Sequence, residues 1–186
     1  MTVDELTPRR REILDAALAL VERGGLEALT MRALADSLGM RAPSLYKHFP
    51  DNASLEAGLA AIGLEAFAER LERADPSLSS VAREYRAFAV ARPELYRLLT
   101  ARRLPRERLP ADLERRAAAP VMSAVGDPDL ARAVWAFAHG MAILELSARF
   151  PEGADLDAAW GEGVRAFEAS ISHVPVRHRG NGPRRQ

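Results

Sequence analysis

Two short apolar stretches on either side of Gly39 constrain this chain more than any other feature. Over residues 30–38, apolar side chains recur at helical spacing, and Thr30 can accept a hydrogen bond from the free N–H groups of the first turn. Gly39 stands where the chain must turn sharply after a helix, a place that penalises a Cβ atom. Pro43 suits the first turn of a second helix because its φ is already helical. The sequence therefore predicts two short helices joined by a tight turn.

The second of these helices, expected over residues 43–49, has one apolar and one polar side. Leu45 and Phe49 are spaced to point inward, which leaves on the outside Ser44, Tyr46, Lys47 and His48. Two helices that cross at a glycine-containing turn form a helix-turn-helix, whose second helix enters the major groove of DNA. An ordinary pair of core helices has the same spacing, so the pattern alone leaves both interpretations open.

The literal residues add a family resemblance. ALTMRALADSLGMRAPSLYKHFP, with an amphipathic helix before it and another helix after it, resembles the N-terminal domain of TetR-family transcriptional regulators. The match extends from Arg9 to Leu71, and Leu-Tyr-x-His-Phe is its most specific part. WAFAHGMAIL, residues 135–144, resembles the C-terminal domain of a TetR subgroup named for its Trp-His-Gly signature. The resemblance implies a dimeric DNA-binding regulator, commonly one that a small molecule releases from DNA.

The periodicity is helical throughout, and no stretch alternates like a strand. Asp75-Pro76 breaks the pattern after a long helix, so we expect a domain boundary between Leu71 and Leu78. The predicted chain is all-α, and its parts are a three-helix helix-turn-helix DNA-binding domain (8–52), a connecting helix (53–74), a helical effector-binding and dimerisation domain (75–174) and a disordered basic tail (175–186).

The second half contains two further features that bear on assembly. Pro120 should kink or break its helix at Ala119. The last two helices, expected over residues 128–149 and 156–173, have apolar residues on two sides, so both should be buried on two sides. Their small residues favour close packing across a two-fold axis between two copies, or packing within one chain: Ala138, Gly140, Ala142, Gly161 and Gly163.

Composition narrows the classes of function. The chain has no cysteine, which excludes a disulfide, a thiolate zinc site and a cysteine nucleophile. A net charge of zero argues against coating nucleic acid by bulk charge, although a local cluster of donors is enough to read a sequence. No secretory signal or membrane span is visible, so we expect a cytoplasmic protein without a membrane partner. No catalytic motif or metal spacing appears either, so we expect no enzyme, no cofactor and no metal site.

Roles in DNA binding can be assigned residue by residue. Thr30 and its helix N-terminus can hold a phosphate, and Tyr46 and His48 can donate to phosphate oxygens, as the resemblance also implies. Arg41 can bind a guanine edge, and Ala42 can contact a thymine methyl group. The predicted DNA-binding residues are Thr30, Arg32, Arg41, Ala42, Ser44, Tyr46, Lys47 and His48. Asn52 stands where the resembled family usually has a lysine, which removes one phosphate contact.

The second half also offers candidates for contacts with a small-molecule effector: Tyr85, Phe88, Leu99, Met122, Trp135 and His139. Core packing is the simpler explanation of each residue taken singly. Taken together, these features predict a ligand-responsive repressor that binds a palindromic double-stranded DNA operator as a homodimer through its last two helices. The alternative is a helical adaptor that keeps the fold and binds a protein in place of DNA.

Overall fold

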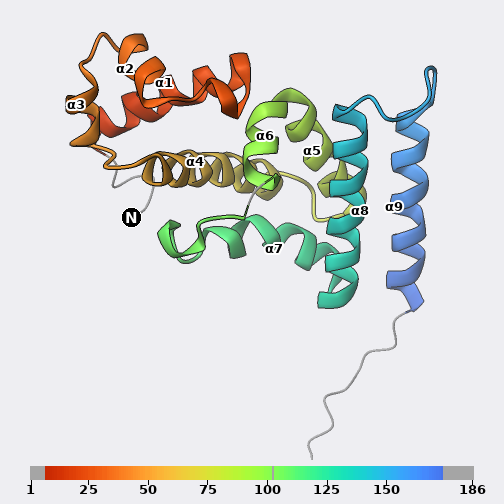
Figure 1. The fold of residues 1–186 in the computed structure, drawn as a ribbon. Coiled ribbons are helices and arrows are strands. Elements are labelled where there is room, and N and C mark those ends of the chain that lie inside the picture. Colours follow the sequence, from red (N-terminus) through yellow and green to blue (C-terminus); the bar gives the residue numbers. More distant parts are fainter. Residues whose placement is uncertain (1–6, 102, 174–186) are drawn as a thin grey trace, which may run out of the picture.

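The computed structural model describes residues 7–101 and 103–173, and all regular structure within them is helical (Figure 1). The prediction of an all-α fold is confirmed. The basic tail expected over residues 175–186 lies outside the described residues. The elements are, in chain order, α1 (Pro8–Gly24), η2 (Leu26–Ala28), α2 (Met31–Ser37), α3 (Ala42–Tyr46), α4 (Asn52–Glu72), α5 (Leu78–Ala91), α6 (Pro93–Thr100), η3 (Arg106–Arg108), α7 (Leu113–Val125), α8 (Pro128–Leu146) and α9 (Leu156–His173).

The head, which we define as residues 8–52, is built around the turn at Gly39 as the sequence predicts. The Thr30 hydroxyl accepts a hydrogen bond from a backbone N–H of the first turn of α2 at 3.0 Å. Gly39 has a φ of 61°, and the N–H of Met40 donates to the carbonyl oxygen of Ala35 at 2.9 Å. This bond satisfies a free carbonyl at the end of α2 and directs the chain into α3.

The long helix α4 connects the head to the body, which we define as residues 75–173 (Figure 1). Two glycines let other helices approach α4 closely. A Cβ on Gly58 would lie 2.7 Å from Leu14 of α1, and a Cβ on Gly63 would lie 2.8 Å from Leu95 of α6. Both α1 and α6 therefore pack directly against the backbone of α4.

Head and body share part of their apolar cores. Leu18 of α1 and Leu98 of α6 pack against the buried clusters on both sides. An ion pair reinforces this junction, because Arg92 Nη2 lies 2.7 Å from Glu22 Oε1. Any displacement of α6 would consequently disturb its contacts with α1.

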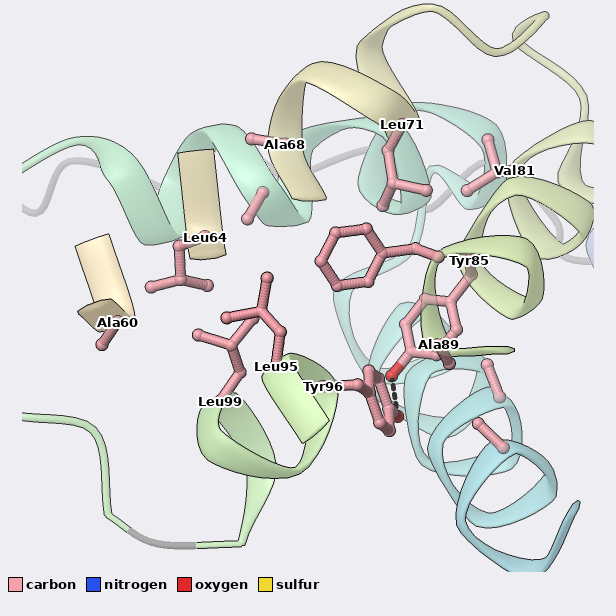
Figure 2. Close-up of a cluster of buried hydrophobic side chains, with 14 of the residues drawn as sticks. Ala60, Leu64, Ala68, Leu71, Val81, Tyr85, Ala89, Leu95, Tyr96 and Leu99 are labelled. Carbon is pink, nitrogen blue, oxygen red and sulfur yellow. Dashed lines mark hydrogen bonds between the residues drawn. The ribbon is translucent and has the colours of Figure 1, made fainter. Parts of the chain in front are cut away.

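The core of the body gathers side chains from α4, α5 and α6, as Figure 2 shows for Leu64, Leu71, Tyr85, Leu95 and Tyr96. Helices α7 and α8 close this core from the other side.

Of the kink or break predicted at Ala119, the break is wrong, because α7 continues through Pro120 to Val125. The missing N–H of Pro120 removes one backbone hydrogen bond. The buried side chains of Leu113, Ala117 and Val125 still hold both ends of α7 against the body.

Helix α8 packs on the body through one of its sides. Val134, Ala138 and Ala142 are buried there, whereas Trp135 is 56% exposed and Leu144 is 43% exposed. The expectation that α8 is buried on two sides is therefore wrong for a single copy of the chain. The physical reason is that no other element of the described chain covers Trp135 or Leu144, which point to different sides of α8.

An arginine of α5 fixes both α8 and α9. Arg86 Nη2 donates to Glu145 Oε1 of α8 at 2.9 Å, and its guanidinium also pairs with Asp157 of α9. Trp160 of α9 donates its indole N–H to Glu145 Oε2 at 3.1 Å. The carboxylates of Glu145 and Asp157 raise the pKa of Arg86, mainly through the hydrogen bonds to Glu145. Arg86 therefore remains charged and ties α5, α8 and α9 together.

Candidate nucleic-acid interface and effector site

Helix α3 is shorter than predicted, since it ends at Tyr46 and not at Phe49. Lys47 is its C-cap, and the N–H groups of His48 and Phe49 both donate to the Leu45 carbonyl, at 2.9 and 3.0 Å. Pro50 disfavours helical backbone at Phe49, so α3 cannot continue through that residue. Lys47 and His48 therefore lie in the turn that closes α3.

The polar side of α3 is open, as the amphipathic pattern predicts. Leu45 and Phe49 are fully buried, whereas Tyr46 is 48% exposed and Lys47 is exposed. Ser44 and His48 are half-buried, with part of each surface open. The structure thus anchors α3 by its apolar side and leaves its donors accessible.

The other predicted DNA-binding residues lie at the start of α2 and the start of α3. Thr30 is exposed, and its hydroxyl keeps a hydrogen that it can donate while it caps α2. The side chain of Arg32 is 93% exposed, with Asp36 only at the limit of an ion pair, 4.0 Å away. Arg41 is the exposed N-cap of α3, and Ala42 is half-buried. All eight predicted residues therefore reach the surface.

One contact behind this surface was not predicted. The guanidinium carbon of Arg10 lies 4.9 Å from the centre of the Phe49 ring, in the geometry of a cation–π contact. Phe49 ends the turn after α3, so this contact helps to fix α3 on α1. The run Arg9-Arg10-Arg11 in the sequence was the only sign of it.

Three of the effector candidates gather around Tyr96 of α6, which was not among the predicted residues. The hydroxyl oxygens of Tyr85 and Tyr96 lie 2.9 Å apart (Figure 2), and the Tyr96 oxygen lies 2.8 Å from His139 Nδ1. The ring of Trp135 lies 6.4 Å from that of His139. The sequence did contain a sign of this contact. Tyr96 lies on the apolar side of residues 93–100, and a buried hydroxyl needs a hydrogen-bond partner.

Burial sets the protonation states of this chain of hydrogen bonds. It raises the pKa of Tyr85 and Tyr96, and the neighbouring Tyr85 raises that of Tyr96 further. Burial lowers the pKa of His139 below its usual value. All three groups are therefore neutral near pH 7, and Tyr96 can donate one hydrogen bond while it accepts another.

The remaining candidates lie at different distances from this chain. Phe88 reaches the tyrosines only through Phe67 of α4. The Phe67 ring packs edge-on against both Phe88 and Tyr85, with ring centres 5.1 and 5.2 Å apart. Leu99 faces α4 instead, where it would meet a Cβ on Gly63. Met122 is 37% exposed on α7. The structure does not bring Leu99 and Met122 to the tyrosines.

The space beside Tyr85 and Trp135 is small. It is a cavity of about 10 Å³ between α5, α8 and α9, with Phe137 and Val164 among its other walls. Such a volume holds about one water molecule. An effector at this place would therefore have to separate α5 from α8. Within the described residues, no group of three or more histidine and acidic side chains could hold a metal ion.

Two family models match the chain. The model described as bacterial regulatory proteins of the tetR family matches residues 13–56, which include α2 and α3. The model described as the tetracyclin repressor-like C-terminal domain matches residues 78–167, from α5 into α9. Together they account for both the head and the body.

Individual proteins agree with these matches. An uncharacterised helix-turn-helix transcriptional regulator of Mycobacterium tuberculosis is 28% identical over 87% of this chain and 81% of its own length. The transcriptional repressor KstR of Rhodococcus jostii is 40% identical over 36% of this chain and 28% of its own length.

Solved structures show the same fold over nearly the whole chain. A possible TetR-family regulator from Streptomyces coelicolor superposes with a TM-score of 0.66 at 21% identity, over 89% of this chain and 100% of its own. A TetR variant from Acinetobacter baumannii in complex with minocycline superposes with a TM-score of 0.62 at 23% identity, over 90% of this chain and 97% of its own.

Proposed function

Because this chain belongs to the TetR family of bacterial regulatory proteins, we propose that it is a ligand-responsive repressor. It binds a palindromic operator as a homodimer, and a small-molecule effector releases it. The observation that carries the proposal is the open polar side of α3 above the fully buried Leu45 and Phe49. Such a helix can enter a major groove while the head keeps its shape.

Within this proposal, each predicted side chain has a role at the DNA. Tyr46, Lys47 and His48 bind phosphates and set the register, together with Thr30 and the N-terminus of α2. Base edges are read by the residues at the start of α3, which are Arg41, Ala42 and Ser44, while Arg32 adds charge beside them.

Dimerisation is proposed through α8 and α9. One head covers only a short site, whereas two heads roughly 34–36 Å apart, or a multiple of that distance, select a palindrome. The exposed Leu144 provides an apolar contact for the partner, and Gly140 lies one turn before it on the same side of α8, where a Cβ would meet open space. Ala138, Ala142 and Gly163 pack within the chain instead, which limits the proposed contact to the outer side of α8 and its neighbour α9.

The effector is proposed to bind where Tyr85, Tyr96, Trp135 and His139 meet. The A. baumannii relative was crystallised in complex with minocycline, which supports a small-molecule site in this fold. An effector that parts α5 and α8 would also shift α6, whose Leu98 packs against the head. It needs to favour the released geometry by only about 1–3 kcal/mol to act as a switch.

The domain organisation proposed from the sequence fits these roles: the head (8–52) binds DNA, residues 53–74 connect, and residues 75–174 bind effector and partner. The proposal also implies a cytoplasmic protein, because its operator is chromosomal DNA. A protein-binding adaptor would keep the same fold, so the DNA itself has to be tested.

The test is a gel-shift titration with the DNA upstream of the protein's own gene, at low salt, where phosphate contacts are strongest. Wild-type protein should shift this DNA, and Lys47→Glu should abolish the shift. Arg73→Glu is the matched control, since it makes the same change of charge on an exposed residue near the far end of α4. If wild-type protein leaves the DNA unshifted, or Arg73→Glu weakens the shift as much as Lys47→Glu, the adaptor is the better account.

A further inference from the structure

The segment between α6 and α7 brings an arginine of the body to the edge of the head. Arg108 is the last residue of η3, and its Nη1 lies 3.2 Å from Asp51 Oδ1. Asp51 is the N-cap of α4 and follows the turn that closes α3. Figure 1 shows the segment before α7 extending beneath α4 toward the end at which α3 lies.

This segment is anchored, and its arginine is not buried. Leu109 is buried in the core of the body, and Leu104 packs against the same core. The Arg108 N–H also donates to the Pro105 carbonyl at 2.8 Å. The side chain of Arg108 is nevertheless 42% exposed, beside an Asp51 side chain that is 53% exposed. The backbone thus holds the arginine in place while its guanidinium faces solvent.

The guanidinium has donors to spare for an anion. Arginine carries five N–H donors, and the contact with Asp51 uses one of them. The carboxylate of Asp51 also accepts a hydrogen bond from the backbone N–H of Ser54, which is the main reason that its pKa is lowered. Asp51 is therefore charged near pH 7, and alone it would repel a nearby phosphate. Arg108 offsets that charge at a point where Pro50, Asp51 and Asn52 supply no cation.

From this position we propose that Arg108 binds a phosphate of the DNA backbone beside α3, so that the body as well as the head contacts the operator. The inference rests on the proposed function. Charge complementarity and continuity with the surface of Tyr46, Lys47 and His48 support it. Because Arg108 belongs to the segment between α6 and α7, an effector that moves these helices would withdraw a DNA contact directly.

The experiment measures the affinity of the full-length protein for a short fluorescein-labelled duplex of mixed sequence as a function of KCl concentration. Replacing one phosphate-binding cation should lower the slope of log K against log salt by about 0.9 per protomer. Arg108→Gln and Lys47→Gln are each expected to cause this loss. Arg106→Gln is the matched control, because Arg106 lies in the same turn but its Nε donates to Glu114 of α7. It should leave the slope within error.

A fourth variant separates a DNA contact from a pairing role. Asp51→Asn keeps a good N-cap for α4 but removes the ion pair with Arg108. If Arg108 binds DNA, Asp51→Asn retains the wild-type slope. If Arg108 only pairs with Asp51, Arg108→Gln and Asp51→Asn should lower the salt slope equally, and the inference is overturned.

The other outcomes separate this inference from the proposed function. A wild-type slope for Arg108→Gln together with a reduced slope for Lys47→Gln also overturns the inference but leaves the proposed function intact. A wild-type protein that does not bind the duplex would contradict both. Thermal unfolding of each variant checks that the fold is kept.

Discussion

The hydroxyl oxygens of Tyr85 and Tyr96 lie 2.9 Å apart in the core of the body, and the Tyr96 oxygen also lies 2.8 Å from His139 Nδ1. Tyr96 is 2% exposed and Tyr85 is 3% exposed, so water cannot easily replace either partner. The Tyr85 hydroxyl and His139 Nδ1 therefore both depend on one hydroxyl, that of Tyr96.

The variant Tyr96→Phe tests this dependence. It leaves the Tyr85 hydroxyl and His139 Nδ1 without their shared partner, which should lower the free energy of unfolding by about 1–3 kcal/mol. Tyr85→Phe removes only the first of these hydroxyls and leaves Tyr96 bonded to His139. It should therefore lower the free energy of unfolding by less than Tyr96→Phe does. Urea denaturation of both variants gives the comparison. Equal stability of Tyr96→Phe and wild type would show that these hydrogen bonds contribute nothing to the stability of the fold.

The protonation of His139 should make stability depend on pH. Burial lowers the pKa of His139 in the folded state below the value near 6.5 of an unfolded chain. Between these two pKa values the unfolded state binds more protons, so the free energy of unfolding falls as the pH drops below about 6.5. The fall attributable to His139 ends below the folded pKa.

The measurement is the difference between wild type and His139→Gln in denaturation midpoints across this range of pH. Carboxylates contribute equally to both proteins and cancel in the difference. We expect wild type to lose more stability than His139→Gln as the pH falls through 6.5. Parallel curves would mean that His139 titrates as it does in the unfolded chain.

Helix α9 depends on a glycine for its packing on α8. A Cβ at Gly163 would overlap the ring of Phe137, whereas a Cβ at Gly161 would meet only the flexible end of Arg165, at 3.2 Å. Overpacking of this kind costs about 1–3 kcal/mol. Gly163→Ala should therefore lower the thermal midpoint, and Gly161→Ala should not. Similar midpoints for the two variants would contradict the close packing of α8 and α9.

The exposed side of α8 allows a test of the dimer. Leu144 on α8 and Val90 on α5 are both large apolar residues, 43% and 49% exposed. A buried, unpaired carboxylate is costly, so Leu144→Glu should turn the dimer into a monomer in size-exclusion chromatography with light scattering. Val90→Glu should leave the mass unchanged. A dimer that survives Leu144→Glu but not Val90→Glu would place the interface on α5.

Local chemistry allowed much of this fold to be predicted from the sequence. Thr30 caps α2 and Gly39 takes the positive φ of the turn because these preferences depend only on neighbouring residues. Leu45 and Phe49 are buried as their spacing indicates.

Tertiary packing decided what the sequence did not reveal. The helix around Pro120 survives because both of its ends are held by the body, and Trp135 is exposed because nothing in the described chain covers that side of α8. The partnership of Tyr85, Tyr96 and His139 joins three helices, and spacing along a single helix carries no sign of it. For the same reason the contact between Arg108 and Asp51 was not foreseen.

The most direct measurement is a hydroxyl-radical footprint of the protein on the DNA that it shifts. A pair of α3 helices in successive major grooves predicts two protected patches with two-fold symmetry, roughly 34–36 Å or a multiple of that distance apart. Lys47→Glu should erase both patches together. One patch alone, or protection that persists in Lys47→Glu, would contradict the claim that the surface formed by Ser44, Tyr46, Lys47 and His48 enters DNA twice per dimer.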